Sequence, residues 1–130
     1  AGEKVTRLIG RAGRIGIKFN ALLYNNRKLE KICSDQKQGI RELGDQCAKK
    51  LRQRLIELGA ADNLSDISRF PPARCHELTG DRKGSFSVDL QHPYRLIFKP
   101  LGNPVPELAT GGLDLKGICE VLITEIADTH

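Results

Sequence analysis

The sequence is poor in several features that define common protein classes. It has no Met and no Trp, and aromatic residues make up 5% of its 130 residues. No apolar run approaches the roughly 18 residues that a membrane-spanning helix needs. Nothing in it resembles a secretory signal either. We therefore expect one cytoplasmic domain with a core of modest size and no membrane partner.

The cysteines lack the spacing of a metal or redox site. Four are present, at positions 33, 47, 75 and 119, and no two form a Cys-x-x-Cys pair. This spacing argues against a zinc ribbon and against a thioredoxin-type site. Disulfides would need an oxidising compartment. We expect reduced cysteines that act as small core hydrophobes, and we expect no cofactor.

Positive charge is concentrated in the first half of the chain. Residues 1–60 carry 14 Lys and Arg against 6 Asp and Glu, whereas residues 61–130 carry 7 against 10. Such asymmetry favours a polyanionic partner that docks on one face. The alternative is a solvated helix surface with a charged tail.

The first half of the chain reads as helical after one short strand. We expect a basic, mostly unstructured arm over residues 1–14, and a folded domain over 15–130 that opens with an alternating strand at 15–19. A short helix is predicted over 25–32. Asp35 then begins a capping pattern for one long helix that ends at Gly59. Its apolar stripe consists of Ile40, Leu43, Cys47, Leu51, Leu55 and Leu58. Its solvated side would carry Lys49, Lys50, Arg52 and Arg54.

The second half changes to an alternating pattern. Strands are predicted over 85–90 and 94–98, joined by a turn at 91–93. A loop rich in Gly and Pro at 100–117 precedes a final strand over 118–126. Helices followed by an antiparallel meander predict an α+β domain, with two N-terminal helices packed on one face of a small antiparallel sheet.

Three histidines limit the chemistry available. Metal-free cleavage of a phosphodiester needs a base, an acid and cations that neutralise charge on phosphorus oxygens. Histidine suits the first two roles. His76 precedes a turn-rich segment, His130 ends the sequence, and His92 is expected in the hairpin turn as a structural or exposed residue.

One arginine is predicted in a central strand. A permanent charge there needs a ligand or a carboxylate beside it. Arg95 therefore either faces a ligand or pairs with Asp89 or Asp128, and the sequence leaves both options open.

Two motifs together resemble a known family. The run His76-Glu77-Leu78-Thr79-Gly80-Asp81-Arg82-Lys83-Gly84-Ser85-Phe86-Ser87-Val88 and the later Tyr94-Arg95-Leu96-Ile97-Phe98 are similar to the core of HigB-type toxins of the RelE/ParE superfamily. The segments 48–55 and 60–66 resemble the family too. The resemblance implies a small antiparallel sheet with two helices, which agrees with the α+β prediction.

The resemblance also implies a function and partners. It implies a toxin of a type II toxin–antitoxin system that cleaves mRNA in the ribosomal A site, held in check by a HigA-type helix-turn-helix antitoxin. By position, His76 and His130 would share proton transfer and Asp128 would assist them. Arg95, with Arg82 or Lys83, would hold the scissile phosphate. The basic helix residues Lys49, Lys50, Arg52 and Arg54 would contact ribosomal RNA.

One position departs from the family pattern. The family typically ends in Asp-Tyr-His, and Thr129 stands in place of that Tyr. A Thr side chain cannot stack on a base, although its hydroxyl can form a hydrogen bond. This difference favours a second interpretation, a non-catalytic RNA-binding homologue or detoxified variant. A third interpretation is a ParE-like inhibitor of DNA gyrase, which would share the fold and the arginine-bearing strand but needs no pair of histidines.

Overall fold

Three short helices form one layer of the molecule. The computed structural model describes residues 6–7, 21–102 and 104–128. Within these ranges the helices are α1 (Arg27–Ser34), α2 (Gln36–Leu43) and α3 (Asp45–Ala60). Asn26 caps α1, because its Oδ1 accepts a hydrogen bond from the Leu29 amide at 2.9 Å. Asp35 caps α2 in the same way, through the Lys37 amide at 3.0 Å.

The long helix predicted from residue 35 to 59 is two helices. It breaks at Gly44, whose φ of 85° and ψ of 163° are open only to glycine. The apolar stripe continues across the break at helical spacing, so periodicity alone did not reveal it. Two helices packed on the sheet were predicted, and the described residues form three.

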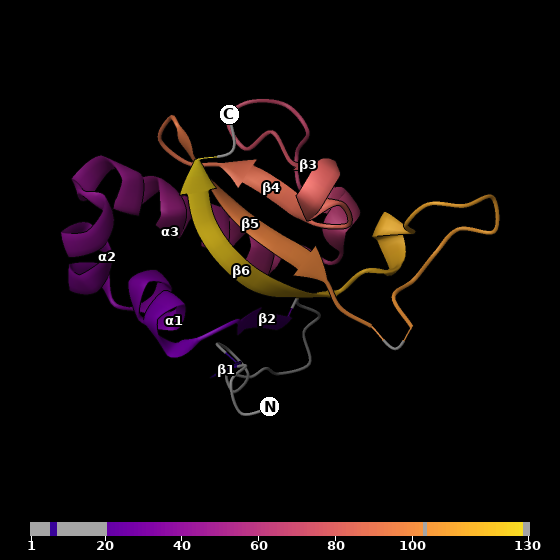
Figure 1. Cartoon of the computed structure of the whole chain (residues 1–130), viewed down its shortest axis with the longest axis horizontal. Helices are drawn as coiled ribbons and strands as arrows, with labels where there is room; N and C mark the ends of the chain where they lie inside the picture. The colour runs from indigo at the N-terminus through magenta and orange to yellow at the C-terminus, as the bar shows by residue number, and fades with distance from the viewer. Residues whose placement is uncertain (1–5, 8–20, 103, 129–130) are drawn as a thin grey trace.

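Among the described residues, the sheet contains six strands in the order β1-β2-β6-β5-β4-β3 (Figure 1). The bounds are β1 Thr6–Arg7, β2 Ala21–Tyr24, β3 His76–Glu77, β4 Phe86–Asp89, β5 Tyr94–Pro100 and β6 Glu120–Asp128. The β4–β5 and β5–β6 pairs are antiparallel, as predicted. β3, a strand that was not predicted, also pairs antiparallel with β4. β2 runs parallel to β6, so the sheet is mixed and not purely antiparallel.

Two expectations for the start of the chain have different outcomes. The strand predicted over 15–19 lies outside the described residues. Thr6 and Arg7 form β1 inside the arm that was expected to carry little structure, and they pair with Tyr24 and Leu23. The predicted loop at 100–117 is mostly irregular, with one short 3-10 turn at Leu115–Gly117.

The core lies between the helices and one face of the sheet. α3 contributes Leu51, Leu55 and Leu58 to it. The sheet contributes Leu22, Tyr24, Phe86, Val88, Leu96, Phe98, Val121 and Ile123. Because side chains alternate along a strand, Ser87, Asp89, Arg95 and Ile97 point to the opposite face, which we call the outer sheet face. The α+β architecture predicted from the sequence is confirmed.

Candidate functional site

The outer sheet face brings together residues from four strands. His76 pairs with Ser87, Ser87 with Ile97, and Ile97 with Glu125, which forms one row across the sheet. The adjacent row on this face pairs Asp89 with Arg95. Residues directly opposite one another on neighbouring strands have adjacent side chains. Two of the predicted site residues, His76 and Arg95, therefore lie in neighbouring rows of one face.

Asp89 is the centre of an arginine cluster. Its Oδ1 lies 3.3 Å from Nε of Arg95, and its Oδ2 lies 3.2 Å from Nε of Arg74. Of the two options left open for Arg95, the structure shows a carboxylate partner, Asp89. The Arg95 side chain is 10% exposed and that of Arg74 is 50% exposed. One carboxylate shared between two guanidinium groups leaves the cluster with a net positive charge.

Arg54, on α3, forms a hydrogen bond to Asp89 from the helical layer. Its Nε donates to the backbone oxygen of Asp89 at 3.0 Å, and its Nη1 donates to Glu57 at 2.6 Å. Arg54 is 4% exposed, so its predicted place on the solvated side of the helix is wrong. Sequence spacing missed this because a guanidinium can be buried when its donors are satisfied.

His76 stands exposed at the edge of the outer sheet face. Its Nδ1 donates to the backbone oxygen of Arg74 at 3.0 Å. A carbonyl oxygen only accepts, so this contact places the proton on Nδ1. In the neutral ring Nε2 is then the nitrogen that can take up a proton.

Arg82 is held by a carboxylate from a distant strand. Its Nε and Nη2 donate to the two carboxylate oxygens of Glu125, at 3.0 and 3.2 Å. This bidentate hydrogen bonding raises the pKa of the Arg82 guanidinium above its ordinary value. Lys83 beside it is exposed. Glu125 was not among the predicted site residues. Its alternation with Thr124 and Ile126 indicated only that it lies in the final strand.

Asp128 of the predicted site does not share a row with Arg95. Asp128 pairs with Tyr94, whereas Arg95 pairs with Ala127. By strand alternation, Asp128 and Arg95 point to opposite faces of the sheet. Thr129 and His130 lie outside the described residues.

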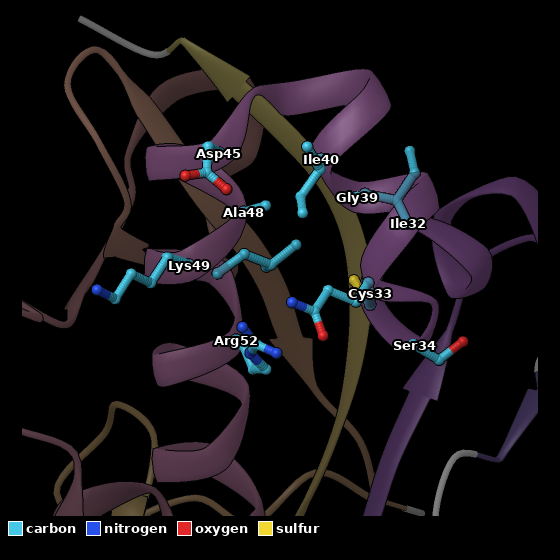
Figure 2. A pocket seen from close by; sticks show the side chains of 11 residues that line it. Ile32, Cys33, Ser34, Gly39, Ile40, Asp45, Ala48, Lys49 and Arg52 are labelled. Atoms are coloured by element: carbon cyan, nitrogen blue, oxygen red, sulfur yellow. The ribbon is translucent and has the colours of Figure 1, made fainter.

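The basic residues predicted to contact ribosomal RNA, other than Arg54, lie on the helical layer, away from the outer sheet face. Figure 2 shows Lys49 and Arg52 projecting from α3 at a groove that α1 and α2 also line, with Ile32 and Ile40 on its other side. Lys50 is exposed on the same helix. α3 packs its apolar side on the inner face of the sheet. The basic helix and the arginine cluster thus belong to different sides of the molecule.

The four cysteines are free thiols, but they are not all core residues. Cys47 and Cys75 are buried, Cys33 is partly buried and Cys119 is exposed. Burial raises the pKa of the Cys75 thiol to about 11, so this neighbour of His76 is protonated at neutral pH. Within the ranges that the structure describes, no group of three or more His, Cys, Asp or Glu is arranged to hold a metal ion.

A comparison with protein families decides the identity of the fold. Residues 22–108 match the model of the HigB-like toxin family, described as RelE-like toxins of the HigB type II toxin–antitoxin system. The chain belongs to this family. As a HigB-like toxin it is a type II toxin of the RelE-like kind, and it has an antitoxin as partner.

Two further findings accompany this match. No curated protein matches the chain. Of the helices in the described parts of this HigB-like toxin, none has the length and apolar character to cross a bilayer. The family match ends before β6, so the positions 128–130 and their roles lie beyond it.

Proposed function

We propose that this toxin is an endoribonuclease that cleaves mRNA in the A site of the ribosome by acid–base chemistry. One observation carries the proposal. A histidine whose Nε2 can accept a proton stands on the same sheet face as a net-positive arginine cluster. RNA cleavage needs both a base and cations that neutralise the phosphorus oxygens.

The reaction assigns a role to each group. Nε2 of His76 takes the proton from a ribose 2′-hydroxyl, and the 2′-oxygen attacks the adjacent phosphorus. The P–O5′ bond breaks and leaves a 2′,3′-cyclic phosphate and a 5′-hydroxyl. His130 protonates the leaving oxygen. Arg95 neutralises charge on the phosphorus oxygens, and Arg82 with Lys83 binds the neighbouring backbone.

Partners and location follow from the same proposal. The antitoxin is of the HigA type, with a helix-turn-helix domain, and the toxin acts in the cytoplasm. Ribosomal RNA is contacted by the basic residues of α3 (Lys49, Lys50 and Arg52) through their charge. Thr129 stands beside His130 and supplies a hydroxyl to the RNA in place of a stacking ring.

The histidines provide the decisive test. We expect His76→Ala to lower the rate of mRNA cleavage on programmed ribosomes by about 10²- to 10⁴-fold, because the proton acceptor is lost. His130→Ala should have a loss of similar size. His92→Gln is the matched control, since it removes an exposed imidazole from the hairpin turn. Circular dichroism should show the same fold for all three variants.

Two results would contradict the proposal. The first is undiminished cleavage by the double variant of His76 and His130. The second is growth arrest with intact mRNA and accumulating cleaved DNA, which would favour the gyrase inhibitor instead. Salt-sensitive RNA binding without any cleavage would favour the non-catalytic homologue.

A further inference from the structure

Arg74 has an unusual backbone conformation next to the proposed base. Its φ is +48°, and no other non-glycine residue in the described ranges has a positive φ. This left-handed conformation is disfavoured for a residue with a Cβ and persists only where surrounding contacts fix it. Here the Arg74 amide donates to Phe70 O at 3.0 Å and the Cys75 amide donates to Ser68 O at 2.8 Å.

This conformation aims the Arg74 carbonyl at His76. The carbonyl oxygen lies 3.0 Å from His76 Nδ1 and accepts its proton in a hydrogen bond. The backbone of one residue thereby fixes both the tautomer and the orientation of the ring. Strain at such a position is a common feature of functional sites, and here a specific contact explains it.

The side chain of Arg74 belongs to the arginine cluster around Asp89. Its Nε forms an ion pair with Asp89 at 3.2 Å, and this contact does not use its two Nη groups. Arg95 shares Asp89 but is 10% exposed, whereas Arg74 is 50% exposed. A phosphate that approaches this face therefore meets Arg74 before Arg95. A guanidinium held at Nε can still bind a phosphate through its Nη groups.

We infer that Arg74 acts in two ways: its guanidinium binds an RNA phosphate beside the arginine cluster, and its backbone positions His76. This inference rests on the proposed function for its substrate, RNA. A single residue then sets the distance between the proton acceptor and the bound phosphate. The competing interpretation is a surface ion pair with Asp89, which would contribute little to stability and nothing to RNA binding.

Substitutions at Arg74 can distinguish the role of its backbone from the role of its side chain. Arg74→Gly removes the guanidinium but accepts a positive φ, whereas Arg74→Ala removes the guanidinium and also disfavours that φ. Arg74→Lys keeps a charge without the fork of donors. Lys116→Gln is the matched control, because it removes one exposed positive charge from the turn at 115–117.

RNA binding tests the proposed role of the Arg74 side chain. With an RNA that carries 2′-deoxyribose at the scissile position, Arg74→Gly should weaken binding and reduce the salt slope by about one, the value for one lost phosphate contact. On programmed ribosomes its cleavage rate should fall about 10- to 100-fold, as expected when a positioning contact is lost. Arg74→Lys should recover part of both losses. Binding and cleavage by Arg74→Gly at the level of Lys116→Gln would overturn the phosphate contact.

The ¹⁵N NMR resonances of the His76 ring report its tautomer, and they test the proposed role of the Arg74 backbone. The Nδ1-protonated tautomer should persist in Arg74→Gly and be diminished in Arg74→Ala, and identical spectra in both would overturn the positioning role. These readouts do not require cleavage. If the wild-type protein cleaves no mRNA, the proposed function fails. A reduced salt slope in Arg74→Gly would still support the phosphate contact, and an unchanged slope would refute it.

Discussion

Two arginines two positions apart on α3 have opposite environments. Arg52 lines the groove beside α1 and α2, whereas Arg54 is buried and donates to Asp89 and Glu57. We expect Arg54→Ala to lower the free energy of unfolding by about 1–3 kcal/mol, because it leaves the partly buried carbonyl of Asp89 without this donor. Urea denaturation measures this change. Arg52→Ala should stay within about 0.5 kcal/mol of the parent, as an exposed substitution does. Equal losses in both variants would contradict the assignment.

Single residues show where sequence reasoning reached its limit. His76 and Arg95 were predicted as site residues through the motifs that resemble the HigB family, because a histidine before a turn and an arginine in a strand also have structural explanations when taken singly. Arg74 belongs to the same short segment, but its importance depends on a φ of +48° and on Asp89, which no local pattern reveals. Arg54 was misplaced because helical spacing does not show that its guanidinium reaches Asp89, 35 residues further along the chain.

At the scale of the elements, Gly44 separates α2 from α3. Its φ of 85° is disfavoured for any residue with a Cβ, but a Cβ there would meet no atom within 4 Å. The cost of Gly44→Ala is therefore conformational, and we expect a loss of about 1–3 kcal/mol in stability. Thermal or urea unfolding measures it.

Gly59 supplies the control for this prediction. It lies inside α3, and a Cβ there would only touch Leu22 Cδ1 at 4.0 Å. Gly59→Ala should be neutral or stabilise the protein by up to about 1 kcal/mol, since alanine is the better helix former. If Gly44→Ala were as stable as Gly59→Ala, the break between the helices would not depend on glycine.

The elements themselves were largely predictable, and their pairing was not. The hairpin of β4 and β5 follows from alternation over 85–98, and its strands pair as expected. The parallel pairing of β2 with β6 joins segments about a hundred residues apart, so no local period encodes it. The helix break at Gly44 is invisible to periodicity because the apolar stripe resumes in phase.

At the scale of the molecule, the basic residues that the proposal uses lie on two sides of the described part of the chain. The arginine cluster belongs to the outer sheet face, and Lys49, Lys50 and Arg52 belong to the helical layer. The triple replacement of these three by Gln should raise KM for ribosomes and reduce the salt slope of binding by about two to three, while kcat is retained. Sedimentation of toxin–ribosome mixtures over a range of KCl measures the slope. A loss of kcat with no change in slope would place these residues in the chemistry instead.

The parallel pairing of β2 with β6 also concerns how the toxin is made. β2 receives its partner only after about a hundred further residues have been synthesised, and contacts between such distant segments form late in folding. A nascent chain that still lacks β6 also lacks Glu125, the partner of Arg82, and the strand that pairs with Arg95. Co-translational folding thus leaves the site incomplete until β6 has emerged.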